Sequence, residues 1–437
     1  MRLSQQAKWF GSLALAAAIG CGQAPPEAVV TAPQAASETR NSPVIPVDGG
    51  LPADIAELVS RGDVSLAVAE LSSRLEKDPQ QVGWLAARST LYLRSGAHDL
   101  ALKDINAAIE RQPDQARFHN NRGFVLMALR KHQEAHAALK QAMKLDPAYA
   151  NPHNNEGLLL LAEGRVQEAI PAFSAALELE TGYVDAYNNR GFCHMQLGQF
   201  EKALIDFNTA LRIDPQYVNA INNRGLLKLS AGDADAAILD FTDAMMRDPL
   251  NPKYYLHRRQ AYLAQGETDR ARQDEQKVDW LKELQALNTG LSRNPADVEV
   301  LTKRARHFIA GGDSDAATAD LERVFAVNPH SQDAYVIQGE MAFAEKRYEK
   351  TLSACEQALK IGDFLPARSL RGDAYLHLGE YDKALEDFVA TRRIDSQVAE
   401  AYWQRSRQHA AKGASEAAAE DLARAQQLEP EIETRLR

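Results

Sequence analysis

The sequence contains few of the features that support catalysis or nucleic-acid binding. Its 437 residues include only three cysteines, too few for the disulfide framework of a small secreted domain. The formal charge of −10 argues against a non-specific phosphate-binding surface, and so against nucleic acid as a partner. No phosphate loop, nucleophile elbow or nucleophile–base pair is present. We therefore expect a protein that is not an enzyme and needs no cofactor or metal.

The N-terminus differs from the rest of the chain. Arg2 and Lys8 are followed by an apolar stretch, residues 9–19, that is too short to span a bilayer as a lone helix. The stretch ends in "AAIGC", which resembles the lipobox of bacterial lipoproteins. The resemblance implies that residues 1–20 are a signal peptide and that acyl chains such as palmitate are attached to Cys21. Because Gly22 follows, it also favours the outer membrane. An ordinary secretory signal is the alternative.

Residues 21–50 contain the acylated cysteine of this resemblance and a tether rich in Ala, Pro and Ser. Such a composition cannot bury a core and is typical of a flexible segment. Fully stretched, the tether would reach about 100 Å. We expect a lipid-anchored protein of the bacterial cell envelope whose working domain faces the periplasm.

From residue 51 onward the chain repeats itself with a period of 34 residues. The segment "VDAYNNRGFCHMQLGQFEKALIDFNTALRIDPQY", residues 184–217, shows one full repeat. Its Gly, Ala, Phe and Pro positions resemble the tetratricopeptide repeat (TPR), a helix A–turn–helix B unit. The resemblance implies an all-α, right-handed α-solenoid superhelix. Eleven repeats start near residues 48, 82, 116, 150, 184, 218, 252, 298, 332, 365 and 399.

Residue types that recur at the same repeat positions explain how each repeat folds. Small residues at repeat positions 8 and 20, such as Gly191 and Ala203, let helices A and B approach closely. Glycine at position 15, such as Gly198, ends helix A in a left-handed turn. Proline at position 32, such as Pro215, ends helix B. No repeat can bury its apolar face alone, so stacking supplies the core.

The array is interrupted once. Twelve extra residues separate the seventh and eighth starts, and Leu281, Leu284, Leu287 and Leu291 continue at helical spacing there. We predict an extended helix B and a break in the superhelix near residues 278–297. The break separates repeats one to seven (51–285) from an insertion (286–297) and repeats eight to eleven (298–432). The short tail, residues 433–437, leaves an end that could dock a partner or a second copy by self-association.

Seven repeats carry arginine at position 7 and aspartate at position 23, on helices that pack antiparallel. We predict a structural ion pair between helices A and B in each of them. The pairs are Arg88/Asp104, Arg190/Asp206, Arg224/Asp240, Arg258/Asp274, Arg304/Asp320, Arg371/Asp387 and Arg405/Asp421. Three repeats lose the acid, and among them Arg122 keeps the base opposite Ala138.

Paired asparagines occur in repeats three to six only. They fill positions 5 and 6 as Asn120/Asn121, Asn154/Asn155, Asn188/Asn189 and Asn222/Asn223. With 3.6 residues per turn these positions share a face of helix A with position 9, opposite the core. Position 9 is apolar in the same repeats: Phe124, Leu158, Phe192 and Leu226. In the family that the chain resembles, this face lines the concave groove.

The amide pairs have two interpretations. One is a ladder that binds the backbone of an extended peptide, as amides can both donate and accept; the related array of the O-linked N-acetylglucosamine transferases uses asparagines in this way. On that reading, alanine at Asn121, Asn155, Asn189 and Asn223 leaves the melting curve nearly unchanged and removes partner capture. The other interpretation is local bonding across helices.

Other candidate groups favour structural roles. His132 and His136 are one turn apart, but a third zinc ligand and an HExxH order are missing. Cys193 and Cys355 lie more than four repeats apart and are expected to be buried thiols. We therefore expect a membrane-anchored scaffold that binds an extended protein segment in its groove and supports assembly of an envelope complex. The alternative is an accessory subunit that captures substrate for a separate envelope enzyme, such as a cell-wall hydrolase or secretion or pilus machinery.

Overall fold

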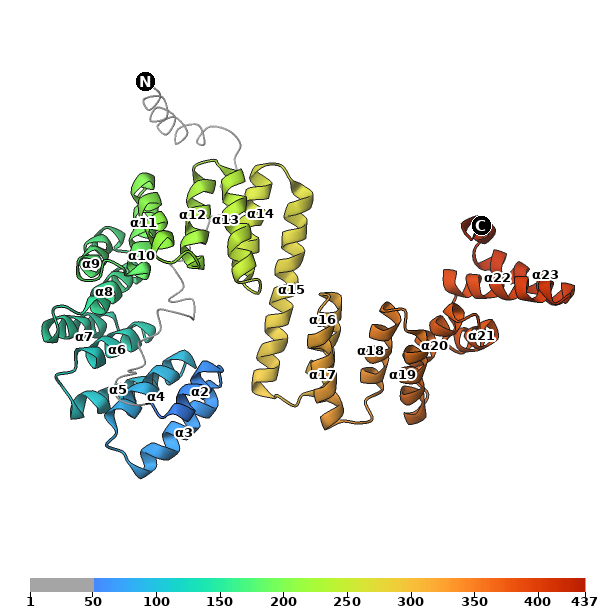
Figure 1. Ribbon diagram of the computed structural model, residues 1–437, viewed down its shortest axis with the longest axis horizontal. Helices are drawn as coiled ribbons and strands as arrows, with labels where there is room; N and C mark the ends of the chain where they lie inside the picture. The colour runs from blue at the N-terminus through green and yellow to red at the C-terminus, as the bar shows by residue number, and fades with distance from the viewer. Residues whose placement is uncertain (1–50, 437) are drawn as a thin grey trace, which may run out of the picture. The chain divides into compact units, whose positions relative to one another are not determined.

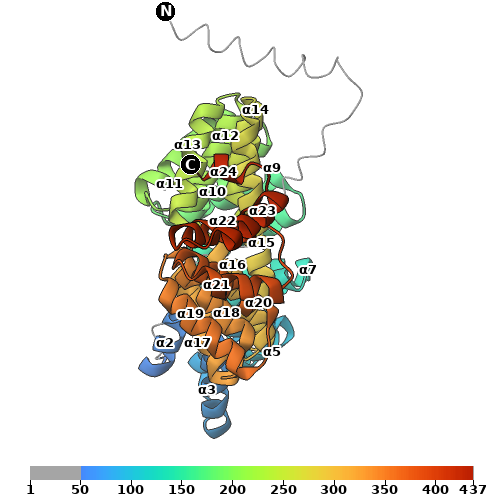
Figure 2. The ribbon, with the colours of Figure 1, turned by 90° about the vertical axis from the view of Figure 1, so that its right-hand side faces the viewer.

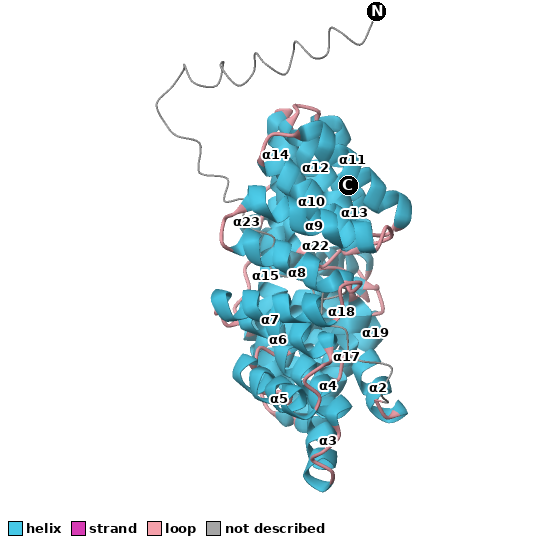
Figure 3. Ribbon diagram, turned by 90° about the vertical axis from the view of Figure 1, so that its left-hand side faces the viewer, coloured by secondary structure: helices cyan, strands magenta, loops and turns pink. Residues whose placement is uncertain are grey.

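The computed structural model describes residues 51–436. This part of the chain contains 23 helices and no strand (Figure 1, Figure 3). The predicted signal peptide, Cys21 and the tether lie outside the described residues. Between residues 51 and 436, no helix combines the length and the apolar character that crossing a membrane requires.

The helices follow one another as helix A–helix B pairs in two compact bodies, which Figure 2 shows from a second side. The first body ends at Arg247 and contains α2 (Ala53–Ser60), α3 (Val64–Lys77), α4 (Val82–Arg94), α5 (His98–Arg111), α6 (Ala116–Ala128), α7 (His132–Leu145), α8 (Ala150–Ala162), α9 (Val166–Leu179), α10 (Val184–Gln196), α11 (Phe200–Ile213), α12 (Val218–Ser230) and α13 (Ala234–Arg247). The second body begins at Asp248 and contains α14 (Pro252–Ala264), α15 (Thr268–Arg293), α16 (Val298–Ala310), α17 (Ser314–Val327), α18 (Gln332–Ala344), α19 (Tyr348–Ile361), α20 (Leu365–His377), α21 (Tyr381–Ala390), α22 (Ser396–Ala411), α23 (Ser415–Leu428) and α24 (Ile432–Arg435).

The predicted α-solenoid of helix pairs is confirmed. In repeats two to ten, helix A begins at the residue at which the sequence predicts the repeat to start. In the eleventh repeat, α22 begins at Ser396, three residues before the predicted start at 399. The reason is Asp395, whose side chain accepts hydrogen bonds from the backbone N–H groups of Gln397 and Val398 and so caps the helix early.

Small residues bring the two helices of each repeat together. A Cβ atom on Gly157 would lie 2.6 Å from the Phe173 ring, which is fully buried. Any side chain at position 8 of the fourth repeat would therefore displace the ring or the helix. The turn after helix A is left-handed as expected, with φ of +70° at Gly198. Arg130 adopts the same conformation in repeat three, with φ of +57°, although it carries a side chain.

The predicted extended helix is present as α15, a continuous helix of 26 residues. Its first half pairs with α14 through Arg258 and Asp274. Its middle supports α16, because the Trp280 indole N–H donates to the His307 carbonyl oxygen at 3.1 Å and the two rings stack 4.7 Å apart. Twelve extra residues displace the next repeat by about 18 Å along this helix, since each residue adds about 1.5 Å. The chain divides into its two compact bodies earlier, between Arg247 and Asp248, so a break of the superhelix along this helix stays a prediction.

The last repeat is partly covered by α24. Ile432 is fully buried in the core of that repeat. Arg435 donates to the Glu429 carboxylate at 2.8 Å and to the Ser396 carbonyl oxygen at 3.3 Å, which fastens the tail to helix A. The four residues of α24 thus cover part of the last repeat, which the sequence predicts to be uncovered.

Candidate functional site

The structure contains all seven arginine–aspartate pairs that the sequence predicts. In each pair the arginine Nε and Nη2 groups donate to the two oxygens of one carboxylate. In repeat two these distances are 2.7 and 2.9 Å, and Asp104 is 5% exposed. The third nitrogen of Arg88 donates to Ser72 in the preceding repeat at 3.0 Å. The arginine therefore fixes the packing within a repeat and its contact with the one before.

Several of the carboxylates also face a second basic side chain that the pairing rule does not include. The aspartates concerned are all buried: Asp206, Asp240, Asp320, Asp387 and Asp421. Their second neighbours are His194 at 4.0 Å from Asp206, Lys228 at 2.7 Å from Asp240, Arg323 at 3.6 Å from Asp320, Arg368 at 3.5 Å from Asp387 and His409 at 3.7 Å from Asp421. A carboxylate has about four acceptor sites, and one arginine occupies only two of them, so a second donor is favoured once the group is buried. In these repeats the sequence prediction of one acid and one base is therefore incomplete.

Repeats three and four, which lack this pair, use a different polar contact. The His136 ring lies between two carboxylates, with Nδ1 2.7 Å from Glu156 and Nε2 3.1 Å from Glu163. Arg165 donates to the other oxygen of Glu163 at 2.8 Å, and this bond is the main reason that the pKa of Glu163 is lowered. Glu156 stands where the other repeats have arginine. The histidine on α7 thus joins repeat three to repeat four across their boundary.

Arg122 fills position 7 of repeat three, where the aspartate of the other pairs is replaced by Ala138. Its Nε is buried and has no hydrogen-bond partner among residues 51–436, and burial lowers the pKa of its guanidinium. Position 7 points toward helix B, so this arginine lies on the side of α6 opposite the groove face. Within the described residues, no group of three or more His, Cys, Asp or Glu side chains is placed to hold a metal ion.

The paired asparagines form a row of hydrogen bonds between consecutive A helices. Asn155 Nδ2 donates to Asn120 Oδ1 at 2.8 Å, which joins α8 to α6. The same bond recurs at 3.1 Å from Asn189 to Asn154 and at 2.9 Å from Asn223 to Asn188. All eight side chains except Asn223 are buried. The geometry favours the second interpretation of the sequence, local bonding across helices. We call this row the asparagine ladder.

The first amide of the ladder lacks an acceptor. Asn121 would donate to position 5 of repeat two, which is Ala86, and its buried Nδ2 has no partner among the described residues. Asn154 Nδ2 is likewise buried and without a partner in that part of the chain. The row therefore begins at repeat three for a chemical reason, the alanine at position 5 before it.

The apolar residues of the same face are more accessible than the amides. Phe124, Leu158 and Leu226 at position 9 are partly exposed, whereas Phe192 is buried. Met127, Met195 and Leu229 at position 12 are also partly exposed. We call Phe124, Leu158, Leu226, Met127, Met195 and Leu229 the apolar strip. It lies on α6, α8, α10 and α12, which the asparagine ladder holds side by side.

A row of tyrosines beside the strip was missed in the sequence. Tyr149, Tyr183 and Tyr217 fill position 34 of repeats three, four and five, each just before a helix A. Asn120 Nδ2 lies 3.5 Å from the Tyr149 hydroxyl oxygen, and the Tyr217 hydroxyl donates to Asp185 on α10. Burial raises the pKa of Tyr149 to about 12. Aligning position 34 across the repeats would have revealed the row, because tyrosine is confined to the block that carries the asparagines.

Both cysteines of the described residues are inert thiols. Cys193 and Cys355 are fully buried and unbonded to each other. Burial raises the pKa of each thiol to about 12, so neither forms an appreciable amount of thiolate near neutral pH. The expectation of buried structural cysteines agrees with this placement.

The buried His119 makes the folding stability depend on pH. Its Nε2–H donates to the Pro113 carbonyl oxygen at 2.7 Å, whereas the buried Nδ1 has no partner in the described chain. Burial lowers the pKa of His119. In the unfolded chain a histidine takes up a proton below about pH 6.5, so folding stability is complete above that pH and falls as the pH drops below it.

We predict that His119→Tyr reduces this loss. In repeat seven the Tyr255 hydroxyl donates to the Pro249 carbonyl oxygen at 3.1 Å, so tyrosine makes the same bond without titrating in acid. Urea unfolding at pH 7.5 and pH 5.0 should show a smaller drop in the free energy of unfolding for the variant than for the unchanged chain. His330→Tyr, at an exposed position, is the control and should keep the full drop. Equal drops in both variants would contradict the assignment to His119.

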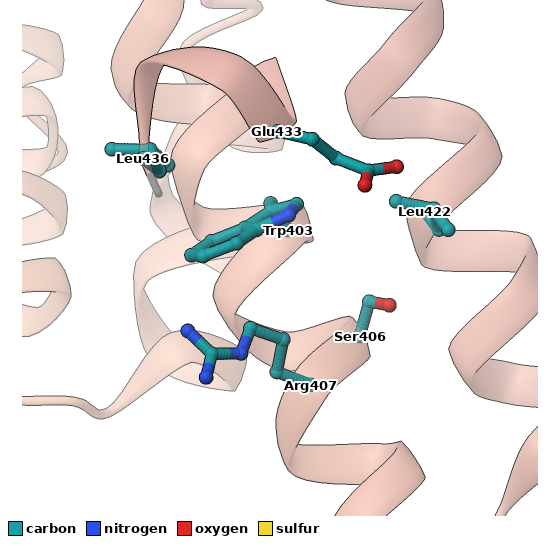
Figure 4. A pocket seen from close by; sticks show the side chains of 6 residues that line it. All are labelled: Trp403, Ser406, Arg407, Leu422, Glu433 and Leu436. Carbon is teal, nitrogen blue, oxygen red and sulfur yellow. The ribbon is translucent and has the colours of Figure 1, made fainter.

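A pocket of about 490 Å³ lies in the last repeat, between α22, α23 and α24 (Figure 4). Trp403 forms one wall, and the Arg407 guanidinium carbon lies 4.8 Å from the centre of its ring. Leu422 and Leu436 add apolar surface, and Glu433 lies at the rim. The sequence predicts that the last repeat has an uncovered end. The pocket is the part of that end which α24 does not cover.

Family comparison agrees with the helical geometry. A tetratricopeptide repeat model matches residues 184–217. A second model of the same repeat matches residues 86–150, 120–180, 222–279 and 302–366. The matched residues together make up more than half of the chain. None of the curated proteins matches it.

Solved structures with the same kind of fold match part of this chain. The APC/C hetero-tetramer Cut9–Hcn1 is 22% identical, with a TM-score of 0.42 over 65% of this chain and 54% of that one, so the match spans about half of its length. PilW, a widely conserved type IV pilus biogenesis factor, is 23% identical, with a TM-score of 0.42 over 45% of this chain and 91% of that one. A tetratricopeptide repeat protein from Parabacteroides merdae is 23% identical, with a TM-score of 0.33 over 59% of this chain and 97% of that one.

Proposed function

The chain belongs to the tetratricopeptide repeat family, and we propose that it is a lipid-anchored scaffold which binds an extended segment of a partner protein along the apolar strip. Proteins of this family are generally protein-interaction scaffolds without catalytic activity. The observation that supports this site is the partly exposed apolar strip on four consecutive A helices. Part of this strip already packs against the core, and its exposed part gains further free energy when another surface covers it.

The asparagine ladder has a supporting role in this proposal. Its inter-repeat bonds hold α6, α8, α10 and α12 at a fixed spacing, so the strip is arranged before the partner binds. A preformed surface costs less conformational entropy on binding than a mobile one. The amides thus contribute to binding through the shape of the groove.

The anchor and the location complete the proposal. Acylation of Cys21 would hold the chain at an envelope membrane, more readily the outer one, and the tether would let the repeats work in the periplasm while a complex assembles. Labelling with a fatty-acid analogue should be lost in Cys21→Ala. Self-association, if it occurs, would use the pocket beside Trp403.

Charge placed in the strip should weaken partner binding. Burial of a leucine side chain contributes about 1.5–3 kcal/mol, so Leu158→Asp or Leu226→Asp should weaken binding by a factor of at least about ten. The readout is crosslinking in the producing bacterium from a photoreactive residue at position 124. The matched control is Leu239→Asp on α13, where leucine is 70% exposed outside the strip. The site is wrong if the strip variants crosslink as strongly as the control.

A further inference from the structure

We propose that the segment bound along the apolar strip adopts a polyproline II conformation, with an apolar residue at every third position and its acidic end toward repeats two and three. This inference rests on the proposed function and specifies the chemistry of the partner. It is carried by the spacing of the A helices, the tyrosine row and the charges at one end of the strip.

The spacing of the strip is set by the asparagine ladder. Side chains of two to three atoms bond directly between α6 and α8, between α8 and α10, and between α10 and α12. Helices in such contact have axes about 8–10 Å apart. The strip therefore presents one apolar site about every 8–10 Å along the groove.

Only one extended conformation matches that interval with one side chain per site. A polyproline II helix rises about 3.1 Å per residue and has three residues per turn, so the same side recurs about every 9.3 Å. In a β-strand the same side recurs after two residues, about 6.7 Å, or after four, about 13.4 Å. Neither β interval falls within the range of 8–10 Å. The partner's apolar residues should therefore be three apart.

The aromatic residues beside the strip suit the same conformation. Tyr149 and Tyr183 are partly exposed at successive repeat boundaries, and the Tyr149 hydroxyl oxygen lies 3.5 Å from Asn120, one helical turn before the strip residue Phe124. Grooves lined by aromatic side chains are the usual receptors of polyproline II segments, because the flat rings pack against proline. The hydroxyl of Tyr217 is already engaged by Asp185, so this row offers its rings more than its polar groups.

Charge gives the segment a direction. Arg94 on α4 and Arg130 after α6 are exposed, and the described residues contain no carboxylate paired with either. Arg130 lies three residues beyond Met127 of the strip. At the other end of the strip, the turn after α12 carries the exposed acid Asp233. A partner with acidic residues beside repeats two and three would face these arginines and keep its negative charge away from Asp233.

The test uses the full chain and three fluorescent peptides of defined sequence. The first is Asp-Asp followed by four Leu-Pro-Ser triplets. The second has the same composition, but its four leucines occupy every second position. The third replaces Asp-Asp of the first with Lys-Lys. Fluorescence anisotropy gives the dissociation constant of each peptide for the unchanged chain, for Leu158→Asp, for Leu239→Asp and for Arg94→Glu/Arg130→Glu.

We expect the first peptide to bind at least tenfold more tightly than the second, and to be weakened by Leu158→Asp and not by Leu239→Asp. The double glutamate variant should weaken the first peptide several-fold and strengthen the third. Equal binding of the first two peptides, still lost in Leu158→Asp, would overturn the polyproline II register while the proposed groove stands. Failure of the first peptide to bind overturns the register as well, and the crosslinking experiment then decides the groove separately. If the double variant changes the dissociation constants of the acidic and basic peptides equally, the proposed direction of the bound segment is wrong.

Discussion

Arg88→Ala is expected to lower the free energy of unfolding by about 3 kcal/mol, because it leaves the Asp104 carboxylate buried and without its partner. Asp104 is 5% exposed and accepts two hydrogen bonds from Arg88 in the unchanged chain. Urea unfolding followed by circular dichroism gives the loss. Because repeat arrays are stabilised by each repeat and its neighbours, hydrogen exchange should accelerate first in α4 and α5.

A second arginine provides a matched comparison. Arg224→Ala removes the same kind of partner from Asp240, but the Lys228 ammonium lies 2.7 Å from that carboxylate and remains. We therefore expect a loss of about half the size. The double variant Arg88→Leu/Asp104→Leu should regain most of the stability, since an apolar pair replaces both charges. A loss as small in Arg88→Ala as in an exposed lysine variant would show that these pairs do not stabilise the repeats.

Features that recur at a constant interval could be predicted from the sequence. The helix starts, the close approach at Gly157 and the arginine–aspartate pairs all recur in a chain that can be aligned to itself. A repeated interval of sixteen residues between Arg88 and Asp104 identifies two facing positions, because each repeat folds in the same way. The extra twelve residues could be placed in a long helix since Leu281, Leu284 and Leu291 keep helical spacing, and all three are buried.

Features outside that regularity could not be predicted. His136 meets Glu156 and Glu163 at separations of 20 and 27 residues, and no other repeat has a histidine at the position of His136. The early start of α22 depends on a single cap, Asp395. The first depends on side chains that meet across one repeat boundary, and the second on one local contact between a side chain and the backbone.

The second bases beside the buried aspartates belong partly to each class. His194, Lys228 and His409 each stand twelve residues before their aspartate, an interval that aligning the repeats could have revealed. Asp320 is approached by Arg323 from its own helix, whereas Asp387 is approached by Arg368 from the helix before it. These last two contacts use different repeat positions, so they could not be predicted in this way.

The arrangement of the asparagines could be predicted in part. Their position on the groove face of helix A follows from 3.6 residues per turn. Adjacent residues differ by about 100° around the helix, so positions 5 and 6 lie on opposite flanks of that face. Each flank meets a neighbouring A helix, position 5 the next one and position 6 the previous one. A projection of a single helix shows that the asparagines lie on the groove face. It does not show the neighbouring A helices that cover the edges of this face.

For this reason the response of the asparagines to alanine should differ from the one that the sequence alone predicts. Replacing Asn121, Asn155, Asn189 and Asn223 removes three inter-repeat hydrogen bonds and leaves three acceptor oxygens without their donors. An unsatisfied buried polar group costs about 1–3 kcal/mol, so we expect the four substitutions to lower the free energy of unfolding by about 3 kcal/mol or more.

Alanine itself fits these positions, because repeat two carries Ala86 and Ala87 there. Additional substitution of Asn120, Asn154 and Asn188 removes the stranded acceptors and should restore part of the lost stability, since neither partner of each bond then remains. Thermal and urea unfolding of the two variants measures the difference. If the four-substitution variant melts like the unchanged chain, the amides do not depend on one another, and direct contact with the backbone of a partner becomes the better explanation of why they occur in four consecutive repeats.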